Sequence, residues 1–360
     1  MVNRTLRWTL SIAATVAVVA APAAASTPVP PEDAHVVVDR LAGADRYQTA
    51  ALVSAQFPDG VDTVYLANGE DWAQGADAVA AGAAAGSGTV PPLVADPSGR
   101  PAPILLVRAG GIPAATRVAL EELAPTTAVI LGGPLVVNPS VDEALVAAGI
   151  EPIRVFGQDR YGTAAVLATT FEPGFDTVYV ASGQPLIPKP PFVPMMPDAL
   201  TASARAGAEG APVLLTKSSS LPVVMRQALE ALDPPSITIV GGLGTVSAYV
   251  ESELRQIAPV SRISGSTRFE TAAKLFEDYE SGAPTTYLAS GEWFADALSV
   301  SSLAASQGAP VLLANQSRLP GATRDGLVSL DPDTVRFVGG PGVLSDDLML
   351  EVEELLAPTP

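Results

Sequence analysis

One short pattern occurs three times along the 360-residue chain and constrains its architecture more than any other feature. Each copy has an arginine, a glycine three positions later, a second arginine three positions after that, and a Thr-Ala pair at its end. The copies begin at Arg40, Arg154 and Arg262. They are about 110 residues apart, a domain-sized period that is far longer than a solenoid repeat. The chain is therefore predicted to contain three homologous modules.

Each copy is followed by the same series of motifs in the same order. Three apolar stretches per copy have the length and composition of strands buried in a parallel sheet. They cover residues 63–69, 103–107 and 128–133 in the first copy, 177–183, 212–216 and 237–242 in the second, and 286–291, 310–314 and 335–340 in the third. The last stretch of each copy ends in a Gly-Gly pair.

Helices are expected between these strands. An aspartate opens an alanine-rich stretch after the first strand, and we call these residues the helix-start aspartates: Asp77, Asp198 and Asp296. A proline after the second strand, at Pro113, Pro222 and Pro320, predicts the first turn of another helix. Strands that alternate with helices indicate βαβ units. We predict three tandem α/β sandwiches over residues 36–149, 150–258 and 259–358, with ligands bound at the carboxyl ends of the strands.

Composition excludes several classes of function. There are 20 Lys and Arg against 38 Asp and Glu, a net charge of −18, which argues against a nucleic-acid partner. The absence of cysteine excludes disulfides and thiolate chemistry. The single histidine, His35, precedes the first repeat, so no serine triad is expected. Only a pair of carboxylates acting as a glycosidase remains open as enzyme chemistry.

Residues 1–25 have the pattern of a secretory signal peptide. Arg4 and Arg7 precede a short apolar run, and a stretch of alanines provides a cleavage site. That run is too short to cross a membrane, and we expect no transmembrane segment in the mature chain. The sequence therefore predicts a secreted protein, with no covalent anchor expected.

The ordered motifs resemble the cell-wall-binding repeat 2 family of Gram-positive surface proteins. The resemblance covers essentially all of the predicted mature chain and rests on R-x-x-G-x-D-R-Y-x-T-A, V-Y-L-A-S-G, F-A-D-A-L, P-V-L-L and V-G-G as they stand here. It implies Rossmann-like or Toprim-like modules around a pseudo-threefold axis. It also implies non-covalent binding to an anionic wall polymer, either a secondary polysaccharide or a teichoic-acid-like chain. The low number of lysines suggests an actinobacterial origin.

The repeated arginines and the aromatic residue that follows the second one are the candidates for ligand contact, because guanidinium groups suit phosphate and carboxylate. The predicted ligand-binding residues are Arg40, Arg46, Tyr47, Arg154, Arg160, Tyr161, Arg262, Arg268 and Phe269. A structural interpretation competes: Asp45, Asp159 and Thr267 suit helix N-caps, and the arginines and aromatic rings can join neighbouring modules. The third copy lacks the aspartate and the phenol, so we expect it to bind ligand differently.

No catalytic residue, metal site or cofactor is predicted. A metal site would need a second acid near each helix-start aspartate, and none occurs at a matching place in every copy. Tight turns account for the Gly-Gly pairs, although such pairs can also cradle an anion.

Two insertions interrupt the symmetry, at Val90 to Ala102 and at Gln184 to Pro197. The second is rich in proline and is either a contact for a protein partner or a surface flap. The leading hypothesis is a secreted, non-enzymatic wall-binding protein. The alternatives are an extracellular binder of a soluble ligand without wall attachment and, less favoured, a wall-acting hydrolase.

Overall fold

The computed structural model describes residues 36–58, 60–70, 75–91, 99–185 and 196–357. These described residues form one compact unit. The predicted signal peptide, His35 and most of both predicted insertions lie outside the described residues.

Three four-stranded parallel sheets organise this unit, and each defines a lobe. In sheet order, lobe 1 has β3 (Ile104–Val107), β2 (Thr63–Asn68), β4 (Thr127–Leu131) and β5 (Glu151–Val155). Lobe 2 has β7 (Val213–Thr216), β6 (Val178–Ser182), β8 (Ile237–Val240) and β9 (Val260–Ile263). Lobe 3 has β11 (Val311–Ala314), β10 (Thr286–Ser290), β12 (Thr334–Val338) and β1 (Val37–Leu41). The predicted fold class, three tandem parallel-sheet α/β units, is confirmed.

The edge strand of each sheet comes from the start of a sequence repeat. β5 and β9, which carry the first arginines of repeats 2 and 3, complete the sheets of lobes 1 and 2. β1 pairs in parallel with β12, with Val37 opposite Thr334 and Leu41 opposite Val338, and so completes lobe 3. Each sheet therefore contains a strand of the next repeat, in cyclic order. The segment boundaries predicted from the sequence follow the repeats, whereas each sheet also includes a strand of the next repeat. The boundaries of the segments therefore stay a prediction.

Helices connect the strands in every lobe. Lobe 1 contains α1 (Arg46–Ser54), the short 3-10 helix η1 (Ala76–Ala78), α3 (Ala81–Ser87), α4 (Ala114–Leu123) and α5 (Pro139–Ala147). Lobe 2 contains α6 (Arg160–Ala168), α7 (Pro197–Ala208), α8 (Val223–Leu232) and α9 (Ala248–Leu254). Lobe 3 contains α10 (Arg268–Leu275), α11 (Phe294–Gln307), α12 (Gly321–Leu330) and α13 (Asp346–Leu356). The predicted prolines precede their helices by one residue, because Pro113, Pro222 and Pro320 are N-caps.

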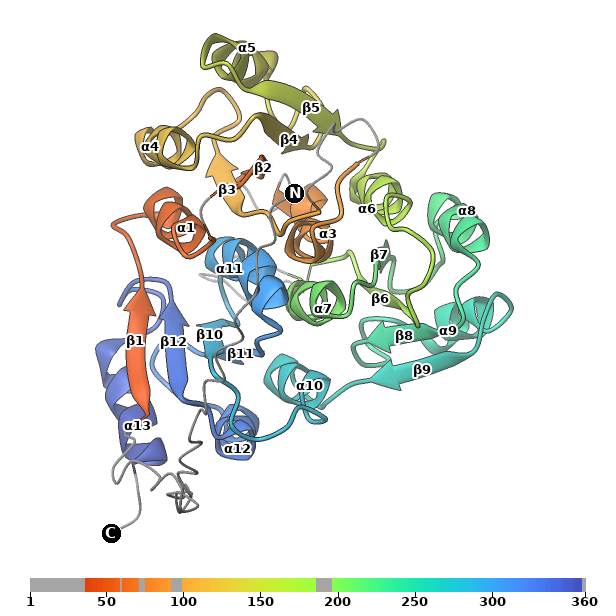
Figure 1. Ribbon diagram of the computed structural model, residues 1–360. Helices are drawn as coiled ribbons and strands as arrows, with labels where there is room; N and C mark the ends of the chain where they lie inside the picture. The colour runs from red at the N-terminus through yellow and green to blue at the C-terminus, as the bar shows by residue number, and fades with distance from the viewer. Residues whose placement is uncertain (1–35, 59, 71–74, 92–98, 186–195, 358–360) are drawn as a thin grey trace, which may run out of the picture. The chain divides into compact units, whose positions relative to one another are not determined.

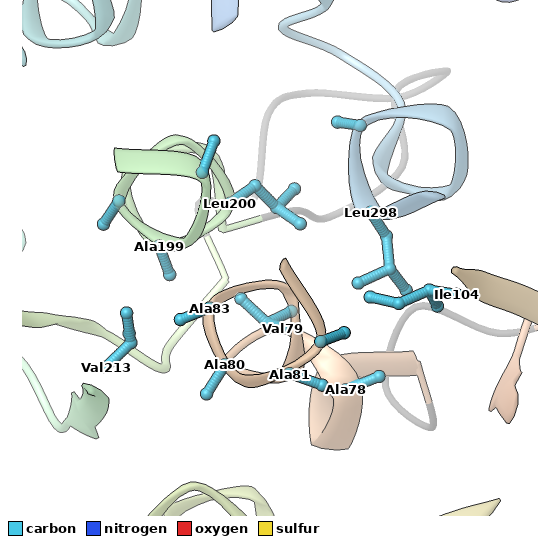
Figure 2. Close-up of a cluster of buried hydrophobic side chains, with 14 of the residues drawn as sticks. Ala78, Val79, Ala80, Ala81, Ala83, Ile104, Ala199, Leu200, Val213 and Leu298 are labelled. Atoms are coloured by element: carbon cyan, nitrogen blue, oxygen red, sulfur yellow. The ribbon is translucent and has the colours of Figure 1, made fainter. Parts of the chain in front are cut away.

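The three alanine-rich helices, α3, α7 and α11, pack against one another (Figure 1). Small side chains allow their backbones to approach closely: a Cβ added to Gly86 would lie 2.2 Å from the Cβ of Ala305. Ser203 in α7 donates a 2.6 Å hydrogen bond to the carbonyl oxygen of Val79, which connects lobes 2 and 1. Figure 2 shows Val79, Leu200 and Leu298 among the buried side chains of this region. The lobes thus share one core with approximate threefold symmetry.

The strand order creates a crevice in each lobe. In lobe 1 the chain runs from β2 to β3 on one side of β2 and then returns to β4 on its other side. The strand order therefore reverses between β2 and β4. The same reversal occurs between β6 and β8 in lobe 2 and between β10 and β12 in lobe 3. In parallel sheets, ligands bind outside the carboxyl ends of the strands at such a switch point. The Gly-Gly pair and the helix-start aspartate follow these two strands in every lobe.

Candidate binding clefts between the lobes

Motifs from two different lobes meet at the boundary between lobe 3 and lobe 1. A cavity of about 500 Å³ lies there, lined by residues 43–46 at the start of α1, residues 293–296 at the start of α11, and residues 340–343 after β12. Thr49 and Glu70 complete the lining. We call this cavity the 3/1 cleft. It lies at the switch point of lobe 3 and is covered from the side by lobe 1.

The first arginine of each repeat fastens the edge strand to the preceding lobe. Its guanidinium donates to the carbonyl oxygen of the first glycine of a Gly-Gly pair: Arg40 to Gly339 at 2.6 Å, Arg154 to Gly132 at 3.2 Å, and Arg262 to Gly241 at 2.6 Å. Each also pairs with an acid in the helix that follows that Gly-Gly pair, namely Asp346, Asp142 and Glu251. These three side chains are only 14% exposed. The contacts found for them are structural, and ligand binding by them stays a prediction.

The glycine and the threonine of the repeat pattern build a tight turn together. The N–H groups of Gly43, Gly157 and Gly265 donate to the hydroxyls of Thr49, Thr163 and Thr271 at 3.0–3.1 Å. A Cβ at Gly43 would lie 2.1 Å from the Cβ of Gln48, so the turn admits glycine alone. The predicted N-caps are confirmed: Asp45, Asp159 and Thr267 accept hydrogen bonds from N–H groups in the first turns of α1, α6 and α10.

The second arginines, which are Arg46, Arg160 and Arg268, start these helices and reach toward the clefts. Each donates to the backbone carbonyl of the glycine that follows β2, β6 or β10. Arg46 donates to Gly69 at 2.6 Å, Arg160 to Gly183 at 3.2 Å, and Arg268 to Gly291. The guanidinium of Arg46 also lies 5.9 Å from the ring centre of Phe294 in lobe 3. Arg46 lines the 3/1 cleft, whereas Arg40 does not.

The aromatic residue after each second arginine is packed inward. Tyr47 and Tyr161 are each 7% exposed, and Phe269 is partly buried. The rings pack on glycines after the first strands, so that a Cβ at Gly69, Gly183 or Gly291 would lie within 3.1 Å of the ring. Their packing is structural, and ligand contact by the rings stays a prediction.

The helix-start aspartates are buried at the bottom of the inter-lobe boundaries. Asp198 and Asp296 are 7% and 6% exposed, and Asp77 is partly buried. Burial raises the pKa of each of the three carboxyls to about 6. The carboxylates face the first glycine of their Gly-Gly pair, where φ lies between +105° and +120°. The turn interpretation of these pairs is therefore confirmed for their first glycine.

Each helix-start aspartate also interacts with the second arginine of the next lobe. Arg160 lowers the pKa of Asp77, Arg268 that of Asp198, and Arg46 that of Asp296, in each case against the larger effect of burial. The three Asp–Arg relationships run from lobe 1 to 2, from 2 to 3 and from 3 to 1. This cyclic arrangement repeats the same pair of charges at all three lobe boundaries.

The sequence did not reveal the distant partners of the repeated arginines, such as Gly339 and Asp346 for Arg40. It also did not single out a cation in the loop that follows the P-x-L-L strand of each lobe, although Arg108 and Lys217 come directly after the apolar stretches 103–107 and 212–216. Among the described residues there is no group of three His, Cys, Asp or Glu side chains that could hold a metal ion. The described helices also include none with the length and apolar character of a membrane span.

Comparison with protein families identifies these modules. The sequence model of cell wall binding domain 2 (CWB2) matches the chain three times, over residues 40–142, 154–251 and 262–349. The chain belongs to the cell wall binding domain 2 family. Its domains are therefore wall-binding domains, which places the protein at the cell wall or cell surface.

Two curated relatives come from Bacillus subtilis (strain 168). The chain is 27% identical to the amidase enhancer over 323 residues, which are 89% of this chain and 40% of that protein. It is 25% identical to the N-acetylmuramoyl-L-alanine amidase LytC over 308 residues, 86% of this chain and 56% of that protein. The chain thus spans about half the length of the curated relatives that it matches.

Two solved structures share this CWB2 architecture. Cwp6 from Clostridium difficile has a TM-score of 0.77 at 25% identity, covering 93% of this chain and 50% of the Cwp6 chain. Cwp8 from the same organism has a TM-score of 0.72 at 26% identity, covering 89% of this chain and 52% of the Cwp8 chain. The three-lobed fold is therefore common to this chain and these cell-wall proteins.

Proposed function

We propose that this chain is a secreted, non-enzymatic protein that binds an anionic secondary polymer of the cell wall in the clefts between its lobes. The observation that carries the proposal is the second arginine at the lobe boundary. Arg46 faces a cavity of about 500 Å³, at the switch point where parallel sheets bind ligands. A guanidinium in such a cavity suits a phosphate or a carboxylate.

The charges within the cleft are compatible with an acidic ligand. Among the described residues, no ion pair includes Arg46, and its guanidinium donates to the neutral carbonyl of Gly69. Asp296, with a pKa of about 6, is partly protonated in mildly acidic solution and then carries a donor instead of a full negative charge. Asp45 and Glu70 also line the cleft, so an acidic ligand must gain more from direct contact with the Arg46 guanidinium than it loses to these carboxylates.

The net charge of −18 repels a polyanion at long range. Salt screens this repulsion beyond about 8 Å at physiological ionic strength, whereas contacts within a cleft are screened much less. Recognition must therefore depend on short-range contacts. The same Asp–Arg relationship occurs at three lobe boundaries, and binding at all three would be strengthened because the second and third contacts become intramolecular.

The remaining parts of the proposal rest on the sequence. Residues 1–25 act as the signal peptide, the mature chain has no membrane span, and neither a metal nor a cofactor takes part. The polymer is a secondary polysaccharide or a teichoic-acid-like chain, and the Gln184 to Pro197 insertion is a candidate contact for a protein partner. The division into segments 36–149, 150–258 and 259–358 is also retained as a proposal.

Co-sedimentation with isolated Gram-positive walls tests the proposal. The chain without residues 1–25 should bind intact walls and lose binding to walls from which hydrofluoric acid has removed phosphate-linked polymers. The triple variant R46Q/R160Q/R268Q should bind at least 10-fold more weakly, because a hydrogen bond to a charged group contributes about 1.5–3 kcal/mol. Thermal unfolding would establish that the variant is folded.

A matched control removes the same charge elsewhere. R117Q/R255Q/R324Q removes one arginine per lobe, from α4, from the C-cap of α9 and from α12, and should bind walls like the unmodified chain. Equal losses of wall binding in both triple variants would show that binding depends on net charge and not on the second arginines. Failure of the unmodified chain to bind either wall preparation would overturn the proposal and favour a soluble ligand.

A further inference from the structure

A second hollow adjoins the 3/1 cleft on lobe 1. This cavity of about 590 Å³ lies between the start of α1 and the loop that joins β3 to α4. Asp45 and Glu70 line both this cavity and the 3/1 cleft. The two hollows therefore lie next to each other at these residues, near the carboxyl ends of the strands.

Arg108, in the β3–α4 loop, provides the positive charge of this second hollow. Its guanidinium lies 5.5 Å from the ring centre of Tyr47, which is itself buried. Lobe 2 repeats the arrangement, with the ammonium of Lys217 5.7 Å from the ring centre of Tyr161. The buried rings hold the two cations in place, while the cations themselves remain exposed.

Lobe 3 keeps a cation in the corresponding loop but at another position. Asn315 occupies the place of Arg108, and Arg318 lies opposite it, just as Gly111 lies opposite Arg108 in lobe 1. Arg318 lines a hollow of about 420 Å³ together with Phe269 and Glu270. A positive side chain therefore occurs in this loop in all three lobes, although the sequence position has shifted.

These three side chains, Arg108, Lys217 and Arg318, are here called the loop cations. In the part of the chain that the structure describes, none of the ten ion pairs includes a loop cation. The two acids that line the hollow of Arg108 each accept a backbone hydrogen bond. Asp45 accepts the N–H of Gln48 at 2.9 Å, and Glu70 accepts the N–H of Ala109 at 2.8 Å. In a chain with such an excess of acid, exposed cations that lack an acidic partner are available to an outside anion.

We propose that the loop cations form a second anion-binding site in each lobe, and that an acidic polysaccharide lies along a track on which clefts and loop sites alternate. This inference rests on the proposed function and extends it. The acidic groups of successive polymer units would contact a second arginine in the cleft and then a loop cation. Affinity should therefore increase with polymer length beyond what one cleft can hold.

The test measures binding of the chain without residues 1–25 to intact walls, and to the polymer fraction released from those walls, over a series of salt concentrations. R108Q/K217Q/R318Q should weaken binding to both by about 10-fold or more. It should also flatten the salt dependence, since fewer cations contact the polymer. The conservative variant R108K/K217R/R318K should restore most of the affinity.

The control and the cleft variants separate this inference from the proposed function. R117Q/R255Q/R324Q should change binding less than 2-fold. If the loop variant binds like the unmodified chain while R46Q/R160Q/R268Q loses binding, the loop sites are overturned and the cleft proposal stands. If neither variant loses affinity, both are overturned.

Two treatments of the walls identify the acidic group. Loss of the loop-cation effect after carbodiimide amidation of intact walls would assign a carboxylate. Its persistence after amidation, followed by its loss after hydrofluoric acid, would assign a phosphate. An effect that survives both treatments would overturn the assignment of the loop cations to an anion.

Discussion

The carboxylate of Asp296 fills the space that Gly339 leaves open. A Cβ added to residue 339 would lie 2.7 Å from Oδ2 of Asp296, and its backbone has a φ of +115°. The same relationship connects Asp198 to Gly241 at 2.6 Å and, less tightly, Asp77 to Gly132 at 3.3 Å. The strand-end glycine and the helix-start aspartate of each lobe therefore form one structural unit at the cleft.

Substituting this glycine should destabilise the chain strongly. G339A places a side chain in a positive-φ conformation and forces the buried carboxylate to move, so we expect a loss of about 2 kcal/mol or more in the free energy of unfolding. Urea titration measures it. G342A is the matched control in the same loop, because no atom lies within 4 Å of the added Cβ. Similar losses in both variants would contradict the proposed unit.

The raised pKa values of the helix-start aspartates predict a stability that increases in mild acid. Their pKa in the folded chain is about 6, above the ordinary aspartate value of 3.8. Between roughly pH 4 and 6 the folded state therefore binds more protons than the unfolded state, and folding becomes less favourable as the pH rises through this window. From pH 7 to 5 each carboxyl should contribute about 1 kcal/mol of added stability.

Chemical unfolding of D77N/D198N/D296N at several pH values tests this effect. In the triple variant, the free energy of unfolding should increase much less from pH 7 to pH 5 than it does in the unmodified chain. Below that window the opposite effect takes over, because Glu251, Glu270 and Asp278 have lowered pKa values and lose their favourable interactions on protonation. A variant that keeps the full rise would show that other groups cause it.

Binding of an acidic polymer should also respond to these carboxyls. Protonation of Asp296 removes a negative charge from the 3/1 cleft, where Arg46, Asp45 and Glu70 are the other charged residues of the lining. Affinity for walls should therefore increase several-fold from pH 7 to 5. In D77N/D198N/D296N it should be high and nearly independent of pH, as measured by co-sedimentation. Equal pH dependence in the variant and the unmodified chain would place the titrating group elsewhere.

Arg205 forms a contact between lobes 2 and 3 that the other boundaries do not repeat, because alanine and leucine occupy the matching positions in α3 and α11. Its guanidinium donates to both oxygens of Asp278 at 2.6 and 2.9 Å and to Glu209 at 2.6 Å. It also lies 4.8 Å from the ring centre of Tyr279. R205A should lower the free energy of unfolding by about 2 kcal/mol, since it leaves charged and polar partners without their donor.

Thermal or urea unfolding measures the loss in R205A. The comparison is the pair of the exposed Arg255 with the partly buried Glu251. R255A leaves Glu251 its second partner, Arg262, and should cost less than about 1 kcal/mol. A loss in R205A no greater than in R255A would show that the lobes 2 and 3 do not depend on this contact.

The pairing of β1 with β12 is reinforced by an ion pair. Both oxygens of Asp39 accept from Arg336, at 2.7 and 2.6 Å. D39R and R336D alone should each destabilise by about 1–2 kcal/mol, because each places like charges opposite one another on neighbouring strands. The exchange variant D39R/R336D should regain most of that loss in a double-mutant cycle. Additive losses would argue that the two side chains do not interact.

The sequence predicted the local structure well. The apolar stretches at 63–69 and 103–107 are strands, and Asp45 is an N-cap, because burial and capping depend on residues that lie close together in the chain. The family resemblance, which rested on ordered local motifs, is confirmed for the same reason.

Partners at long range could not be predicted from the sequence. Arg40 was a candidate ligand contact, yet its guanidinium contacts Gly339 and Leu344, about 300 positions away. Strand composition does not say which sheet β1 will join, and one arginine does not reveal whether its partner is a carbonyl or a ligand. Arg318 was missed because its place in the loop differs from that of Arg108, so that only the folded turn shows their equivalence.

The cyclic exchange of edge strands also has a consequence for folding. β1 comes first among the described strands, but Asp39 and its partner Arg336 are 297 positions apart. The edge strands of lobes 1 and 2, β5 and β9, follow closely in the chain after the other strands of their sheets. The edge strand of lobe 3 is β1, which lies at the opposite end of the chain from β12. Contacts of such high sequence separation form slowly. Closure of the third sheet should therefore be the last step of folding, and until then β12 carries an open edge.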